Sequence, residues 1–412
     1  MTKEMAYHIL YLAVMLVLLP VLAESIYSPT LPDLAASFSI SGEYAGHTMS
    51  IYLLGASLGP LIWGNISDSY GRRPVVLCAY ALFLLATAVC IFASEFKVFM
   101  FGRLLQGLAG AISCMSPCIL RDVFSHEQRM EVSSTVGMVV SVAPAMGALL
   151  GGAIASTGNW RLTFVFLLVV GIIFYLRLSY ALPETAKTKM PFKLHTFKKG
   201  FYSVFSDPNL LGHAMMIGLG LGICFAFFVE GPFYFTEKLN LSAQWFGLVC
   251  ALGAAAYAIG CRLANHIIQS GVLYTTLMQW GLLLMLFSYT CFTVGVYMVE
   301  AFNLLAYHTY MLSVLLTAFW ILSQFALSFV LTPSFALALE NQAESAGVAA
   351  SWFSFIYNIM NMIISALMAY LHSESLQVMP VYFLLITLLM IIILWVALDK
   401  KWLHAHNVAE CS

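Results

Sequence analysis

Twelve long apolar runs follow one another along this chain, and no other feature limits its possible folds as strongly. A helix needs about 20 apolar residues to cross the hydrocarbon core of a bilayer. The runs cover approximately residues 7–31, 45–67, 74–93, 97–120, 132–156, 162–182, 209–235, 243–267, 273–298, 303–333, 346–371 and 378–398. We therefore predict an all-α polytopic membrane protein with twelve transmembrane helices.

The composition supports the bilayer as the solvent of this chain. Of its 412 residues, 61% are hydrophobic and only 9% are charged, whereas a soluble globular protein carries about 25% charged residues. A formal net charge of −1 argues against a nucleic-acid partner, which would require a basic surface. The nine cysteines and ten histidines show no metal-ligand spacing, so we expect no metal and no cofactor. Cys114 and Cys118, one helical turn apart, leave a metal or redox role open as a minor alternative.

The longest polar interruption falls between the sixth and seventh runs and divides the chain into near-equal halves. We predict an N-terminal six-helix bundle (residues 1–182), a cytoplasmic basic linker (183–208) and a C-terminal six-helix bundle with a short cytoplasmic tail (209–412). The positive-inside rule sets the orientation. With the N-terminus inside, thirteen basic residues lie in cytoplasmic segments and three outside, namely Lys97, Arg161 and Lys238. Both termini are therefore predicted to be cytoplasmic.

The first run also permits another interpretation. Lys3 precedes it and the letters VLA precede Glu24, a pattern that a cleaved signal peptide can show. The membrane assignment does not depend on this choice, because similar runs follow along the whole chain.

The segment after the second run reads GNISDSYGRRP, residues 64–74. It resembles the signature loop of the major facilitator superfamily, and the alternative is an ordinary basic turn. The matching residues are Gly64, Asp68, Gly71, Arg72 and Arg73. The glycines permit a tight turn, Asp68 accepts hydrogen bonds, and we expect the two arginines to anchor the loop at the cytoplasmic surface. The resemblance implies two six-helix bundles around a central cavity, and a loop that controls the conformational switch without binding substrate.

Further segments resemble one branch of that superfamily, the Bcr/CflA group of bacterial drug:proton antiporters. They are RLLQGLAGA (103–111), ILRDVF (119–124), NWRLTF (159–164), LPETA (182–186), GPFYFTEKLNLSAQWFG (231–247) and AGVAAS (346–351). The resemblance covers residues 20 to 370 and implies a multidrug exporter of the bacterial inner membrane.

Three segments depart from the pattern of that group. On helix five, the segment GMVVSVAPAMGALLGG (137–152) resembles the antiporter motif through Pro144, Gly147, Gly151 and Gly152. However, Ala148 follows Gly147 where the antiporter motif has proline, so the direction of transport stays open. On helix one, Ser25 replaces the usual aspartate and Glu24 stands one residue earlier, a rotation of about 100°. The loop after the eighth run, residues 260–271, has no acidic residue.

Four charged residues lie inside the predicted spans: Glu24, Arg103, Arg177 and Glu230. Charges in lipid are costly and usually face a cavity or a partner. The resemblance places helices one, four and seven at the cavity. We therefore expect Glu24 and Glu230 to carry the coupling proton, and Arg103 to influence that proton or to bind a substrate carboxylate. The alternatives are hydrated carboxylates near the outer surface and a structural ion pair for Arg103. Arg177 is expected to reach the inner surface.

Helix-breaking residues follow both acids. Pro29 and Pro32 come after Glu24, and Gly231 with Pro232 comes after Glu230, so we expect irregular segments at matching positions of the two halves. Further candidates for the cavity wall are Tyr27, Gln106, Phe225, Phe228, Trp320 and Gln324. The alternative for the aromatic residues is packing or lipid contact.

The expected function is transport, and we expect no enzymatic activity. We predict a monomeric, proton-coupled secondary transporter that exports small amphipathic compounds by alternating access. An alternative with the same fold is an exporter or proton symporter of one metabolite, such as a siderophore or a carboxylate. A non-transporting membrane receptor is a third alternative, disfavoured because the chain contains no long soluble insertion.

Overall fold

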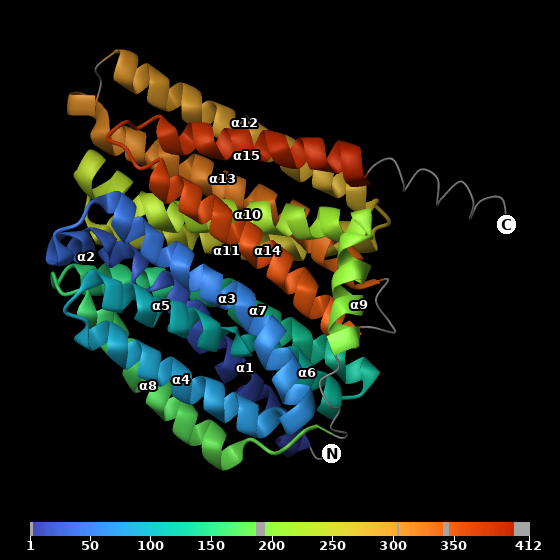
Figure 1. Cartoon of the computed structure of the whole chain (residues 1–412). Coiled ribbons are helices and arrows are strands. Elements are labelled where there is room, and N and C mark those ends of the chain that lie inside the picture. Colours follow the sequence, from blue (N-terminus) through green and yellow to red (C-terminus); the bar gives the residue numbers. More distant parts are fainter. Residues whose placement is uncertain (1–2, 187–193, 303–304, 341–345, 399–412) are drawn as a thin grey trace, which may run out of the picture.

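A computed structural model describes residues 3–186, 194–302, 305–340 and 346–398, and its regular elements there are helices (Figure 1). They are α1 (Lys3–Ser25), α2 (Leu31–Phe38), α3 (Gly42–Tyr70), α4 (Arg72–Phe92), α5 (Phe96–Gly110), α6 (Met115–Val123), α7 (His126–Ala155), α8 (Arg161–Ala181), α9 (Leu194–Phe205), α10 (Pro208–Phe233), α11 (Ala243–Gln269), α12 (Tyr274–Ala301), α13 (Leu305–Glu340), α14 (Ala346–Tyr370) and α15 (Val378–Ile393). Four short helical turns adjoin them, η1 (Ser28–Thr30), η2 (Ala111–Cys114), η3 (Tyr234–Lys238) and η4 (Leu394–Leu398).

Within these described residues, twelve helical segments are long and apolar enough to cross a membrane, which confirms the predicted number. The first is broken as expected, because α1 ends at Ser25 and the chain continues through η1 into α2. Pro29 and Pro32 lie in the first turns of η1 and α2, where their missing amide donors cost least. The fourth span is also divided, since η2 separates α5 from α6.

The helices form two bundles with separate hydrophobic cores. One core draws on residues 9–182 together with Val229, Phe233 and Ala369, and the other on residues 204–398 together with Ala148. In Figure 1 the helices α1 to α8 lie below the helices α10 to α15. The predicted fold class is therefore confirmed, while the boundaries of the three predicted segments stay a prediction.

The bundle has two ends, which we name by their contents. The loop end carries residues 64–73, the start of α1 and the end of α15, and the far end carries the turn between α7 and α8. The predicted linker contains one helix, α9, which crosses the loop end at a steep angle to the spans (Figure 1). Phe201 of α9 packs on Trp352 of α14, with ring centroids 5.0 Å apart. Which end faces the cytoplasm stays a prediction from the basic residues.

Two seams join the halves, α3 against α14 and α7 against α11. Small residues bring the backbones together there. A methyl group built at Gly46 of α3 would lie 2.9 Å from Cβ of Ala369, and one built at Gly247 of α11 would lie 2.6 Å from the carbonyl oxygen of Ala148. The halves are thus in direct contact along both seams.

Candidate functional site

Arg103 is the centre of a buried aromatic box in the N-terminal half. Its side chain is fully buried, and its guanidinium carbon lies 4.0 Å from the ring centroid of Tyr27 and 4.3 Å from that of Tyr52. The ring of Phe164 follows at 5.8 Å. A cation over aromatic faces is stabilised by their quadrupoles, most strongly where water is excluded. The box therefore compensates part of the cost of burying this charge.

The hydrogen bonds of Arg103 leave part of its guanidinium unused. Nη1 donates to Oε1 of Gln106 at 2.5 Å, and Nε2 of Gln106 donates to the hydroxyl of Thr87 at 2.8 Å. The Nε and Nη2 groups of Arg103 have no protein partner. Among the described residues no carboxylate forms an ion pair with it, so the structural ion pair considered as an alternative is not formed there. Buried donors without partners are costly, and these two are available to a ligand.

Glu24 lies beside this box and between the two halves. Glu24 is partly buried, and Arg103 is close enough to act on its carboxylate electrostatically. Glu24 in turn acts on Tyr52 of the same half and on Tyr357 of α14 in the other half. Arg103, Tyr27 and Gln106 are thus brought together, and Glu24 is near enough to Arg103 for their charges to interact. The functional roles of these residues stay a prediction.

The predicted helix-five motif holds the segment that carries Glu24. Helix α7 continues through Pro144 without a break. A methyl group at Gly147 would collide with Ser25, and one at Gly151 would collide with the carbonyl oxygen of Ile26. Gly152 faces α11 instead, because a methyl group there would lie 2.9 Å from the carbonyl oxygen of Ala243. The motif therefore packs against α1 directly after Glu24 and against the other half of the molecule.

The aromatic candidates of the C-terminal half fall into two places. Phe225 and Phe228 touch one another, with centroids 5.9 Å apart, and both pack against the N-terminal core. Trp320 instead stacks on Phe227 at 3.6 Å inside the C-terminal core, and Gln324 accepts a weak hydrogen bond from Cys224 at 3.3 Å. The first pair lies at the interface between the halves, whereas the second belongs to the interior of one half.

Glu230 lies away from the box, toward the far end. It is 1% exposed, and its carboxylate contacts Nζ of Lys238 at 2.6 Å and Nδ1 of His372 at 2.8 Å. The expected break at Gly231 and Pro232 is wrong, because α10 continues to Phe233 and a wider turn, η3, follows. A helix tolerates an internal proline where the surrounding protein satisfies the freed carbonyl. The role of Glu230 in proton coupling stays a prediction.

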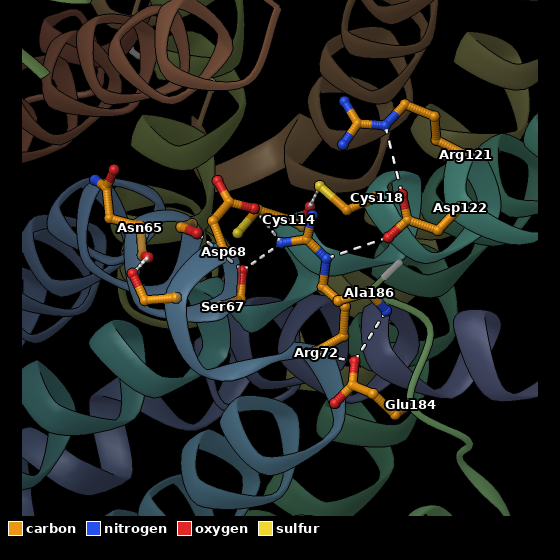
Figure 2. A network of polar contacts seen from close by, with 12 residues as sticks. Asn65, Ser67, Asp68, Arg72, Cys114, Cys118, Arg121, Asp122, Glu184 and Ala186 are labelled. Carbon is orange, nitrogen blue, oxygen red and sulfur yellow. Dashed lines mark hydrogen bonds and ion pairs between the residues drawn. The ribbon is translucent and has the colours of Figure 1, made fainter. Parts of the chain in front are cut away.

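Asp68 and Arg72 of the switch loop belong to a polar network at the loop end (Figure 2). The expectation of a loop is wrong in part, since α3 runs to Tyr70 and α4 begins at Arg72, which leaves Gly71 alone between them. Arg72 was expected at the surface but is only 6% exposed. Nη1 of Arg72 donates to Asp68 at 2.7 Å, and Nε donates to Asp122 of α6 at 3.3 Å. The positive charge of Arg72 is stable in this buried position because it is paired with two carboxylates.

Glu184 also belongs to this network. It lies in the LPETA segment at the end of the N-terminal half. Its Oε1 accepts from the backbone amides of Arg72 at 2.9 Å and of Ala186 at 2.9 Å. An acidic side chain at the first turn of a helix satisfies free amides and interacts favourably with the helix dipole. Arg73 is exposed and donates to the carbonyl oxygen of Ser179 at 2.8 Å, so it stays at the surface as expected.

Replacing Gly71 with Ala is expected to lower the free energy of unfolding by about 1–3 kcal/mol, because its φ of 107° is a region that other residues avoid. The new methyl group would also collide with the carboxylate of Glu184. The measurement is thermal unfolding of the detergent-solubilised protein. Gly295→Ala in α12 is the matched control, since a methyl group there would meet nothing within 4 Å and alanine favours the helix. Equal unfolding temperatures for the two variants would contradict this account.

Sequence reasoning did not assign several partners at these sites. Asp122 and Glu184 stand in segments that carried the resemblance, and Lys238 stands in another, but no local signal indicated what they bind. Phe164 also stands in such a segment, NWRLTF, whereas Thr87 gave no signal, because a threonine in an apolar run is ordinary. Arg177 lies near His8 of α1, with Nη2 3.5 Å from Nδ1. Among the described residues, no group of three or more His, Cys, Asp or Glu could hold a metal ion.

Comparison with known proteins agrees with this architecture. The sequence model of the Major Facilitator Superfamily matches residues 13–365. An uncharacterized transporter of Rickettsia felis is 26% identical over 356 residues, which are 86% of this chain and 87% of that protein. Multidrug resistance protein D of Escherichia coli is 28% identical over 270 residues (65% of this chain, 67% of that protein). The bicyclomycin resistance protein homolog of Haemophilus influenzae is 28% identical over 233 residues (56% and 58%).

The fold is also similar to that of solved transporters. The partially occluded inward-open conformation of the xylose transporter XylE from Escherichia coli superposes with a TM-score of 0.73. The superposition covers 95% of this chain and 98% of that one at 15% identity, so the likeness concerns the fold alone. Together with the sequence relatives, these findings confirm the resemblance to the superfamily and to its Bcr/CflA group.

Proposed function

The chain belongs to the Major Facilitator Superfamily, and from that premise we propose that it exports small amphipathic compounds in exchange for protons. Members of this superfamily are multi-pass membrane transporters and not enzymes. The proposal adds the coupling ion, the direction and the class of cargo. It also includes a bacterial inner membrane as the location, cytoplasmic termini, a monomeric state and alternating access of one cavity to the two sides.

The observation that carries this proposal is the position of Glu24 near the Arg103 box. One carboxylate and one guanidinium lie close enough to influence each other without forming an ion pair. Nε and Nη2 of Arg103 have no partner in the protein. A coupling site needs a group that changes its charge and neighbours that respond to the change. Glu24 provides the proton-binding oxygen, and the rings of Tyr27 and Tyr52 provide an amphipathic wall.

Competition between the proton and the cargo would couple the two movements. A cationic compound gains from a deprotonated Glu24 and loses that attraction when Glu24 binds a proton. Proton entry from one side would then release the compound to that side. Phe225 and Phe228, at the interface of the halves, are placed to contact the apolar part of such a compound.

A second cargo is favoured by Arg103 itself. Its two unpartnered N–H groups could bind a carboxylate with two hydrogen bonds. A metabolite bearing a carboxylate, including a siderophore, is therefore the second candidate. A compound of this kind could move in either direction with protons.

The test is transport by the purified protein in liposomes with an imposed pH gradient. The panel should contain lipophilic cations, zwitterions, neutral amphipathic drugs and carboxylates. We expect protein-dependent accumulation of one or more lipophilic cations that requires the gradient and reverses with its sign. Accumulation of carboxylates alone would support the second cargo. Transport of every substrate without response to the gradient would overturn proton coupling.

A further inference from the structure

The cluster around Glu230 contains a histidine whose protonation state is restricted by geometry. Nδ1 of His372 lies 2.8 Å from Oε2 of Glu230, and Lys238 contacts the other carboxylate oxygen. When Glu230 is ionised and paired with Lys238 at 2.6 Å, its carboxylate only accepts hydrogen bonds, so Nδ1 carries the proton in this contact. In the neutral ring, Nε2 then presents a lone pair. With His372 neutral, the charges of Glu230 and Lys238 cancel.

The imidazole also lies on the seam between the two halves. His372 follows α14 in the C-terminal half, and its ring packs against Gly42, the first residue of α3 in the N-terminal half. A methyl group built at Gly42 would lie 2.5 Å from Nε2 and 2.9 Å from Cε1. One turn later, a methyl group at Gly46 would lie 2.8 Å from Cγ1 of Val229. The ring thus sits at the far end of the α3–α14 seam, against a helix start.

A proton on Nε2 changes the charge at this contact. The cluster then holds two cations for one carboxylate, and the excess positive charge faces the first amides of α3. Those amides carry the partial positive charge of the helix N-terminus. The cation is repelled by this end of the helix, whereas the neutral ring is not.

The other charged groups near His372 either have other partners or are exposed. Glu300 of α12 accepts from the backbone amide of Leu376 at 3.0 Å and from the side-chain amide of Gln377 at 2.5 Å. Glu43 of α3 is turned toward His47, with 4.0 Å between its Oε1 and Nε2 of that histidine. Glu237 and Glu374 are exposed, where water and salt screen their fields. Lys238 lies over the ring of Tyr234, 5.2 Å from its centroid, and stays paired with Glu230.

We propose that His372 is a proton-operated latch: the neutral ring holds the far end closed, and protonation from that side opens it. The latch extends the proposed function, since it rests on alternating access but not on the cargo. It places a proton-sensitive contact at the far end of the bundle, apart from the proposed coupling site at Glu24. A high proton concentration in the solution at the far end would therefore be the signal that opens this end.

The test measures the distance between the two halves at the far end. Spin labels on non-natural amino acids at Thr157 and Phe302, both exposed and one in each half, leave the nine native cysteines in place. Pulsed electron–electron distances are measured in nanodiscs at about pH 8 and about pH 5.5, across the range where histidine changes charge. We expect a longer-distance population to grow at the lower pH. Its absence would overturn the latch.

Two substitutions separate the latch from general effects of pH. His372→Gln is expected to keep the short distance at both pH values. His266→Gln, an exposed histidine at the loop end, is the matched control and should respond as the unmodified protein does. If His372→Gln still opens at low pH, or if His266→Gln abolishes the response, the proposal is wrong.

Two further variants address folding and independence. Gly42→Ala keeps every charge and displaces the ring, so the longer distance should appear at both pH values; a closed far end at pH 8 would contradict the latch. Glu24→Gln should lose proton-driven transport yet keep the pH-dependent opening. If Glu24→Gln abolishes the opening, Glu24 drives it and the latch is refuted, while the proposed coupling role stands.

Discussion

Replacing Glu24 with Gln is expected to abolish transport driven by a pH gradient, with a loss of at least about 100-fold in initial rate. Gln preserves the size and the hydrogen-bonding shape of the side chain but cannot release a proton. Because Arg103 is close enough to Glu24 for their charges to interact, the exchanged proton would change the electrostatics of the Arg103 box. The measurement is gradient-driven uptake of a transported lipophilic cation into liposomes.

The exchange of labelled for unlabelled cargo at equal pH provides the second readout for Glu24→Gln. Exchange moves no net proton, so it should persist if the substitution removes only coupling. Glu95→Gln, which changes an exposed carboxylate, is the control and should transport normally. Full gradient-driven transport by Glu24→Gln would show that another group carries the proton.

Replacing Arg103 with Lys is expected to weaken cargo binding by roughly tenfold or more, although the charge is kept. Lysine lacks the planar fork that lies against the rings of Tyr27 and Tyr52, and an ammonium group is more strongly hydrated than a guanidinium. It also cannot donate to Gln106 and to a ligand with the same geometry. The measurement is the dissociation constant of the transported compound, by fluorescence or calorimetry.

Arg161→Lys is the matched control for Arg103→Lys. Arg161 also lies over an aromatic ring, that of Trp160 at 4.3 Å, but it donates to the backbone oxygens of Ile91 and Ala93 near the far end. We expect Arg161→Lys to lower thermal stability with little change in the dissociation constant. If both variants bind cargo as the unmodified protein does, Arg103 is not part of the cargo site.

The spans and several site residues could be predicted because their signals are local. A charge inside an apolar run stands out from its neighbours, so Glu24, Arg103 and Glu230 were identified. The burial of Arg72 could not be predicted, since an arginine after a span ordinarily lies at the surface. Its two carboxylate partners, Asp68 and Asp122, come from different helices. No property of residues 64–74 alone contains that information.

The sequence by itself determined the number of spans and the charges that are out of place in lipid, because hydropathy and length act along a short stretch of chain. Only the tertiary structure decided which of those charges have partners. It surrounded Arg103 with aromatic rings from three spans. It also gave Glu230 the partner His372, 142 residues away. The physical reason is that helix packing brings together side chains whose separation along the chain carries no local signal.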